Sequence, residues 1–168
     1  TLWGGIVGDD GVDNIEIGQE TSLAQTYSEF QEYVKLHKQL GVLLTVNSKN
    51  DLNNAISGFE RPDSVLNKED FVSFKANWNP KSVNIVETAQ ELSLLPESFV
   101  FVDDNPAERA IIESQVEGVA VPQIDCVEHY IQEIDKAGYF EVTNLSGDDL
   151  KRNKMYQENA KRTELQSS

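Results

Sequence analysis

Two polar clusters in the sequence combine residue types that could bind a phosphoryl group and a divalent cation. Asn47-Ser48-Lys49 follows the apolar run 42–46, and Asp103-Asp104 follows the apolar run 99–102. Two adjacent carboxylates repel each other unless a cation offsets their charge, and Mg²⁺ binds carboxylate oxygens while leaving room for phosphate oxygens. A serine hydroxyl and free backbone N–H groups at a strand end suit a phosphate oxygen. Both clusters are therefore candidates for phosphoryl chemistry.

Lys81 is a third candidate, because it falls in the first turn of an expected helix, where the helix dipole disfavours a cation. A lysine in that position can face a carboxylate or a phosphoryl group. Each candidate also has a purely structural interpretation. Ser48 can be a turn residue and Lys81 a solvated side chain, and Asp103-Asp104 can serve as turn and helix-capping residues. The three positions together favour a site more than any one of them alone.

Strands and helices that would position these candidates alternate along the chain. The apolar runs 42–46, 99–102 and 119–121 are typical of buried strands, and alternation predicts a further strand within 71–78. Helical spacing predicts helices at 23–40, 51–59, 80–94, 106–115 and 126–137. This alternation predicts parallel β-α-β units and an α/β fold. Ligands of such sheets bind beyond the carboxyl ends of the strands, where both polar clusters lie.

Several local signals refine these elements. Asn79-Pro80 and Asn105-Pro106 each pair a capping residue with a proline suited to the first helical position. Asp10-Gly11 between two short apolar runs predicts a β-hairpin turn. The helix at 80–94 is expected to bury one face, formed by Val83, Val86, Ala89 and Leu92.

Length and composition limit the classes of function. The 168 residues suit one domain with a real core, and the net charge of −15 argues against nucleic acid and anionic membranes as partners. No stretch reaches the roughly 20 apolar residues of a membrane helix. The single cysteine, Cys126, allows no internal disulfide and favours a reducing compartment, so a cytoplasmic protein is expected.

The end of the chain differs in charge from the rest. Residues 151–168 carry a net charge of +3, whereas the first 150 residues carry −18. A capping box at 146–149 predicts a C-terminal helix. We therefore divide the chain into a core at 1–145 and a helix or linker at 146–168. The basic segment is interpreted either as a solvated helix or as a docking arm for an acidic partner.

The residues around the candidates resemble the haloacid dehalogenase (HAD) superfamily. Ser48, Lys81 and Asp103-Asp104 match, in order, its motifs II, III and IV. More specifically, the amino-acid sequence resembles the FkbH-like branch, subfamily IIIC, in the segments 1–11, 46–51 and 101–109. The similarity extends to about residue 162. The resemblance implies a Rossmann-like three-layer sandwich with a central parallel sheet and no large cap domain. It also implies Mg²⁺-dependent phosphoryl transfer.

The resemblance assigns a role to each matched residue. Ser48, with Lys49 beside it, would bind the transferring phosphoryl group. Lys81 would neutralise the charge of that group and pair with the nucleophile. Asp103 would ligate Mg²⁺ directly, with Asp104 as a second ligand or as an orienter of a bound water. Fixed cations and donors of this kind contribute most where charge develops on phosphoryl oxygens.

The first family motif, Asp-x-Asp-x-Thr, is matched only at its last position, by Thr1. Its two aspartates are the nucleophile and the acid/base, and they would precede residue 1 together with the strand that carries them. Asp9 and Asp10 cannot replace them, because both lie beyond the glycine pair, in the flap region. Either the sequence is a segment of a longer protein or a preceding piece is supplied separately, and the free-standing chain is expected to be inactive.

Three functions remain open at this stage. About 30 residues separate Gly18 from Ser48, and 33 separate Ser48 from Lys81, which is too few for a large lid domain in either gap. An open site agrees with the FkbH-like role, in which a glyceryl unit from 1,3-bisphosphoglycerate is dephosphorylated and loaded onto an acyl carrier protein. One alternative is a plain phosphatase acting on a small or protein-bound phosphate. The other is a non-catalytic interaction module, because the nucleophile is absent.

The remaining residues that could do chemistry have structural interpretations. Cys126 is expected to be a small buried core residue, although acyl loading would favour a thiol near the site. His37 and His129 fall within predicted helices and are interpreted as structural. Trp3 and Trp78 each lie near a site motif and could line the pocket, but core packing is the default expectation for both.

Overall fold

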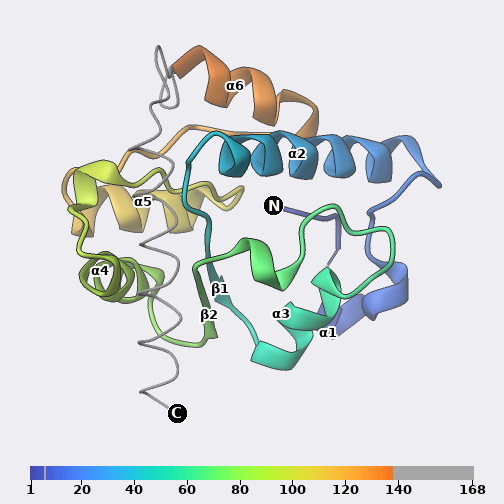
Figure 1. Ribbon diagram of the computed structural model, residues 1–168, viewed down its shortest axis with the longest axis horizontal. Helices are drawn as coiled ribbons and strands as arrows, with labels where there is room; N and C mark the ends of the chain where they lie inside the picture. The colour runs from blue at the N-terminus through green and yellow to red at the C-terminus, as the bar shows by residue number, and fades with distance from the viewer. Residues whose placement is uncertain (6, 138–168) are drawn as a thin grey trace.

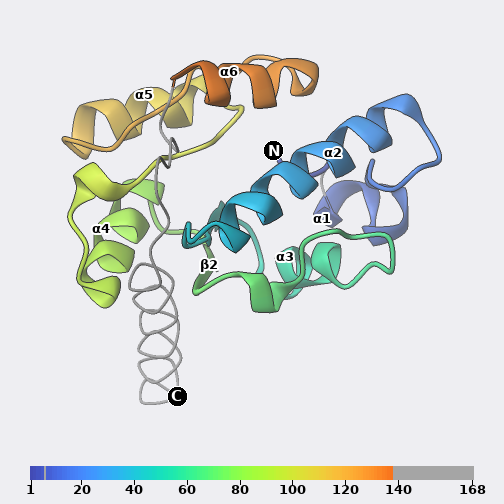
Figure 2. The same ribbon diagram turned by 45° about the horizontal axis from the view of Figure 1, so that its top comes forward.

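The computed structural model describes residues 1–5 and 7–137 (Figure 1). The helices are α1 (Val7–Asp10), α2 (Ser22–Gln39), α3 (Leu52–Phe59), α4 (Lys81–Leu92), α5 (Pro106–Gln115) and α6 (Tyr130–Ala137). The strands are β1 (Thr45–Lys49) and β2 (Ser73–Asn77). Short 3-10 helices lie at Val12–Asn14, Lys68–Asp70, Pro96–Ser98 and Val127–His129. Helix α4 lies on one side of the strands, with α2 and α3 on the other (Figures 1 and 2).

The sheet is parallel, as the alternation of elements predicts. β1 and β2 pair in register from Thr45 opposite Ser73 to Lys49 opposite Asn77. The predicted strands at 99–102 and 119–121 meet in an isolated parallel bridge. There the Phe101 N–H donates to the Ala120 carbonyl at 2.8 Å, and the Ala120 N–H donates to the Phe99 carbonyl at 3.0 Å. The expected α/β fold is confirmed.

Most predicted helices are confirmed, with ends that differ by a few residues. α5 begins at Pro106, and the Asn105 side chain accepts a hydrogen bond from the Ala107 N–H, as the capping signal predicts. The prediction for α4 is off by one residue, because the helix begins at Lys81 and Pro80 holds the N-cap position. β1 also begins later than predicted, so that Ser48 and Lys49 are its last residues rather than part of the loop beyond it.

The predicted apolar face of α4 is wrong in two of its four positions. Val83 and Val86 are 44% and 41% exposed, whereas Ile85, Ala89 and Leu92 are buried. Asn84 and Thr88 are buried on the same side of the helix. The Asn84 amide nitrogen donates to Asn47 Oδ1 at 3.1 Å and to Asn77 Oδ1 at 2.9 Å. The helix therefore turns a polar residue toward both strands.

The predicted hairpin around Asp10-Gly11 is also wrong. Residues Val7–Asp10 form a helical turn, and a single antiparallel bridge joins Gly4 to Glu16. The Gly11 N–H donates to the Val7 carbonyl at 2.9 Å, so the predicted first strand of the hairpin is helical instead. The guanidinium of Arg61 donates to the carbonyl of Ile15 at 2.8 Å and to that of Ile17 at 3.4 Å, on the side of this segment opposite to Gly4.

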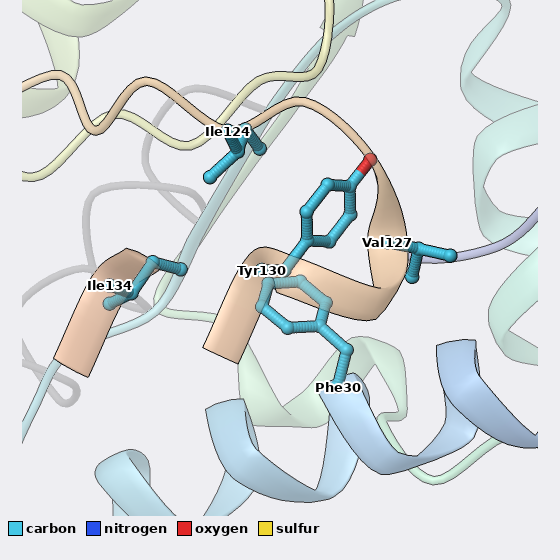
Figure 3. Packing of buried hydrophobic residues seen from close by; sticks show 5 residues of the cluster. All are labelled: Phe30, Ile124, Val127, Tyr130 and Ile134. Atoms are coloured by element: carbon cyan, nitrogen blue, oxygen red, sulfur yellow. The ribbon is translucent and has the colours of Figure 1, made fainter. Parts of the chain in front are cut away.

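Two buried clusters hold the helices to one another and to the segment 99–102. The first joins α2 to α6 and consists of Phe30, Ile124, Val127, Tyr130 and Ile134 (Figure 3). The rings of Phe30 and Tyr130 meet edge to face with centroids 5.2 Å apart. The second consists of Ile85, Phe101, Ile112 and Val116, and it holds α4 and α5 against the segment 99–102. The segment that ends in Asp103 is therefore anchored by packing on α4 and α5.

Two further expectations concern membrane spanning and the C-terminal part of the chain. Among residues 1–5 and 7–137, no helix combines the length and apolar character needed to span a membrane. The capping box predicted at 146–149, the C-terminal helix and the basic segment 151–168 lie outside the described residues.

Candidate functional site

Lys81 and Asp103 form the centre of the candidate site. The Lys81 ammonium donates to Asp103 Oδ2 at 2.5 Å, and both side chains are largely buried. The other carboxylate oxygen, Oδ1, accepts from the Asn105 N–H at 2.9 Å. Arg109 donates to the Asp103 carbonyl at 3.0 Å. A lysine at the start of a helix thus faces a carboxylate at the end of a strand segment, and both oxygens of that carboxylate are engaged.

Asp104 lies beside the first residue of the chain. Its Oδ1 accepts from the Thr1 hydroxyl at 3.0 Å and lies 3.9 Å from the Thr1 amino nitrogen. Burial raises the pKa of Asp104, but the Thr1 amine, the Thr1 hydroxyl and Lys81 outweigh this effect, so the pKa is held below its usual value. Burial in turn lowers the pKa of the Thr1 amino group. Asp104 is half exposed and stays ionised near neutral pH.

The end of β1 is held against the start of α4 by a set of side-chain amides. Asn47 Nδ2 donates to the Lys81 carbonyl at 2.8 Å, and Asn47 Oδ1 accepts from Asn84. Asn84 is fully buried and also bonds Asn77 at the end of β2. These amides fix the helix turn that carries Lys81. The sequence signal for Asn84 is a polar residue within an apolar helical pattern.

Ser48 and Lys49 share β1 but differ in their surroundings. Ser48 lies in the lining of a cavity that Lys81, Asp103 and Asp104 also line. Lys49 lines this cavity too, and its ammonium pairs with Glu108 Oε1 at 3.1 Å. The second carboxylate oxygen of Glu108 is buried without a hydrogen-bond partner in the described part of the chain. The structure therefore brings the predicted residues to one cavity, with Lys49 engaged by a carboxylate.

The cavity has a volume of about 860 Å³ and lies between β1 and the segment 99–103. Its wall includes residues 42–49 on one side and 97–104 on the other. Phe30, Tyr33 and Val34 of α2 and Ile85, Thr88 and Leu92 of α4 also line it. A largely apolar space thus separates the two strand segments, with the polar site residues at the end where both segments finish.

The aromatic and cysteine predictions had mixed outcomes. Trp3 is half-buried: its ring meets Phe59 edge to face with centroids 5.0 Å apart, and it also lines the cavity. Trp78 contradicts the expectation of core packing, because it is 70% exposed in the loop between β2 and α4. Cys126 contradicts the expectation of a buried thiol, because it is exposed in a loop before α6, with its sulfur 3.2 Å from His129 Nδ1. His37 bonds the Tyr33 carbonyl within α2, as a structural residue would.

Comparisons with known proteins give one informative match. No family model matches the chain, and no curated protein matches it. A solved structure is similar to it: the N-terminal part of the protein BF1531 from Bacteroides fragilis, which contains a phosphatase domain and was crystallised in complex with Mg. The two share 39% sequence identity with a TM-score of 0.83 over 86% of this chain. The match spans 39% of the neighbour's length, and at this level of similarity the two chains share a fold.

Proposed function

We propose that this chain is the core of a Mg²⁺-dependent phosphatase of the HAD type. The observation that carries the proposal is the contact between Lys81 and Asp103, a fixed cation and a carboxylate in the lining of the cavity that Ser48 also lines. The similarity to a phosphatase domain crystallised with Mg supports the same reaction class. Phosphoryl transfer depends mainly on positioning and on fixed charges, and this arrangement supplies both.

The residues present fit a magnesium ion. Asp103 and Asp104 offer carboxylate oxygens, and Mg²⁺ is commonly bound through one or two carboxylates while it keeps several waters. A bound Mg²⁺ would neutralise charge on the phosphoryl oxygens. The contact that Asp104 makes with the Thr1 hydroxyl keeps this carboxylate at the cavity wall.

We assign a role to each remaining site residue. Ser48 donates a hydrogen bond to a phosphoryl oxygen, and Lys81 offsets the charge of the same group. Asn47 and Asn84 are positioning residues, because their bonds hold the first turn of α4 and therefore the Lys81 backbone. Lys49 adds positive charge at the end of β1, where Glu108 orients it.

We assign the cavity between β1 and 99–103 to one further β-strand, which would carry the nucleophile. Successive residues of a strand direct their backbone groups to opposite sides. The Leu44 carbonyl accepts from the Val72 N–H at 2.9 Å, so the backbone groups of Thr45 are directed away from β2. On the other segment Phe99 and Phe101 bond Ala120, so the groups of Val100 are directed away from that bridge. Both segments therefore have an edge left for a strand between them.

The walls of the cavity fit such a strand. A buried parallel strand is apolar on both faces, because helices cover both. Here α2 lines one part of the wall with Phe30 and α4 lines another with Ile85. Thr1 is part of the same lining, so a residue joined to its amino group would extend from the wall of the cavity. A strand at this position would end beside Lys81, and an aspartate at its end would complete the site.

The experiment compares Mg²⁺-dependent phosphate release by three proteins. One is the chain alone, and one carries an extension before Thr1 with an apolar strand as long as β1 followed by Asp-x-Asp-x. In the third, the first aspartate of the extension is asparagine. We expect release only from the second protein, lost with EDTA and reduced at least about hundredfold by Asp103→Asn. Glu60→Gln, an exposed change at the end of α3, serves as the matched control.

Three results would contradict the proposal. Equal phosphate release by the proteins with the aspartate and the asparagine extension would show that the first aspartate is not the nucleophile. Release that EDTA leaves unchanged would remove the role of Mg²⁺. A folded extended protein with no activity on any phosphate monoester or acyl phosphate would favour the non-catalytic interaction module.

Within this reaction class, we propose an acyl phosphate such as 1,3-bisphosphoglycerate as donor and an acyl carrier protein as acceptor of the glyceryl unit. The support is the resemblance to the FkbH-like branch and the structure between residues 18 and 81, where helices and two strands leave no separate cap domain. The net charge of −15 opposes docking of an acidic carrier, which leaves the basic segment 151–168 as the docking arm.

Two measurements test this finer proposal. The mass of the carrier protein should rise by one glyceryl unit when donor and extended enzyme are present. Charge reversal at Lys151, Arg152 and Lys154 should weaken carrier binding. Phosphate release without a mass change on the carrier would leave the plain phosphatase.

A further inference from the structure

A second group of potential metal ligands lies in the loop before α6, outside the residues proposed for phosphoryl transfer. Asp125, Cys126 and His129 are all exposed. Cys126 Sγ lies 3.2 Å from His129 Nδ1, and His129 Nδ1 lies 3.4 Å from Asp125 Oδ1. The three ligand atoms lie within 4.8 Å of one another. Three different donor types therefore converge on one point of the surface.

We propose that Asp125, Cys126 and His129 bind a zinc-type divalent cation. Zinc bonds are about 2.3 Å to sulfur, 2.0–2.1 Å to imidazole nitrogen and 2.0–2.2 Å to carboxylate oxygen, usually in tetrahedral geometry. Those bond lengths place tetrahedral ligand atoms about 3.3–3.6 Å apart. The observed separations of 3.2 Å and 3.4 Å are within a few tenths of an ångström of these values. Cys126 Sγ and a carboxylate oxygen of Asp125 lie within 4.8 Å of each other, so a side-chain rotation that draws this third pair together would admit the ion.

The ligand types select the ion. Thiolate and imidazole ligands favour zinc and similar transition metals, whereas Mg²⁺ prefers oxygen ligands. The two sites on this chain thus differ in chemistry, with carboxylates at 103–104 and a mixed set at 125–129. Three protein ligands leave one position for water, as in zinc sites that are open to solvent.

The backbone of this loop is held in place by buried neighbours of the three ligands. Ile124, Val127 and Tyr130 are buried between α6 and Phe30 of α2, and they alternate in sequence with the exposed ligands (Figure 3). A turn in which the His129 N–H donates to the Cys126 carbonyl at 2.9 Å sets the spacing of the two strongest ligands. Packing of this kind lowers the cost of assembling a metal site.

The exposed Glu128 adds a further negative charge between the ligands in sequence. An acidic loop attracts a divalent cation, and the charge of the ion would offset the repulsion between a thiolate and these carboxylates. The contacts seen without an ion, including the Cys126 N–H donating to Asp125 Oδ1 at 2.6 Å, are compatible with a loop that opens slightly to admit one.

The test measures metal binding by the chain itself. Calorimetric titration with Zn²⁺ and absorption spectra with Co²⁺ would be recorded for the parent chain and for Cys126→Ser, His129→Ala and His37→Ala. We expect one equivalent of Zn²⁺ to bind, with a near-ultraviolet thiolate-to-cobalt band in the Co²⁺ complex. Cys126→Ser and His129→Ala should each weaken binding at least about tenfold, and millimolar Mg²⁺ should not compete.

His37→Ala is the matched control, because it removes a histidine of α2 and should leave Zn²⁺ affinity unchanged. Circular dichroism of each variant shows that it folds. The proposal is overturned if the double variant of Cys126 and His129 binds Zn²⁺ as tightly as the parent, or if the Co²⁺ complex lacks the thiolate band. Neither readout depends on phosphate release, so the outcome is separate from that of the proposed phosphatase activity.

Discussion

The two edges of β1 differ in what lies beside them: one edge pairs with β2, and the other faces a cavity. Toward β2, the strand has a full parallel ladder in register. The rings of Phe59, Phe71 and Phe74 pack against one another with centroids 5.2–6.0 Å apart, and Phe59 and Phe71 also reach the lining of the cavity. Toward the segment 99–103, a cavity of about 860 Å³ takes the place of a ladder. The edge of β1 toward β2 is therefore paired along the strand, whereas the opposite edge faces the cavity.

Because no backbone ladder among the described residues crosses the cavity, the site depends on side-chain contacts between its elements. The Lys81–Asp103 contact joins α4 to the far segment at the end of the cavity, and the amides of Asn47 and Asn84 join α4 to β1. Side-chain contacts thus hold the site together where backbone pairing does not. The filled core and the open space should therefore respond differently to the same kind of mutation.

The largest contrast is expected between Ile112→Ala and Val100→Ala. Ile112 is fully buried in the cluster with Phe101, so its truncation creates a new void and should lower the free energy of unfolding by about 2–5 kcal/mol. Val100 already lines the cavity, so its truncation should cost less than about 1 kcal/mol. Urea unfolding of both variants measures the difference. Equal losses would show that the cavity wall is packed like the core.

The second contrast concerns two partly buried lysines with carboxylate partners. Lys81→Met in the strand-extended protein should lower phosphate release by about 10²–10³-fold, because it removes the cation that offsets phosphoryl charge. Lys75→Met removes a lysine of β2 that pairs with Glu91 at 2.8 Å, away from the cavity lining, and should leave release within about twofold. The readout is initial rate at saturating Mg²⁺. A similar loss in both variants would point to a general effect of charge or stability.

Helices α2, α3 and α5 and strand β2 were largely predictable from the sequence. α2, α3 and α5 follow from helical periodicity and capping residues, which are local properties. β2 falls within the predicted alternating segment 71–78. The order of Ser48, Lys81 and Asp103 at element ends was also visible, because parallel β-α-β units bring strand ends to one edge.

The failures share a non-local cause. The hairpin at residues 10–11 was wrong because Val7–Asp10 forms a helical turn that contacts α3, while Arg61, far along the chain, bonds the carbonyls of Ile15 and Ile17. The face of α4 was wrong because Asn84 turns toward amides of both strands. The exposure of Cys126 likewise depends on neighbours, because Val127 and Tyr130 take the buried positions beside it. No local pattern carries such contacts.

The smallest effect is expected at Asp70, which ties α2 to the segment that leads into β2. Its carboxylate accepts from the Asn67 N–H at 2.8 Å and from Lys38 at 2.9 Å. Burial raises the pKa of Asp70, but these two donors and Lys35 outweigh burial, so the pKa lies below its usual value. The ionised form is thus favoured in the folded protein. Asp70→Asn should cost about 1–2 kcal/mol of unfolding free energy at pH 7.

The pH dependence gives this last prediction its sign. A carboxylate whose pKa is lowered by folding stabilises the protein above its unfolded pKa, which is about 3.9, and loses that effect as pH falls through the lower folded value. Urea unfolding should therefore show the gap between parent and Asp70→Asn narrowing below about pH 4. Asp51→Asn, an exposed change at the start of α3 where no side-chain cap bond forms, should shift stability by less than about 0.5 kcal/mol. A gap at Asp70 that stays constant down to the lowest pH at which both proteins fold would mean that packing of the side chain, rather than its charge, holds α2 to the paired side of the sheet.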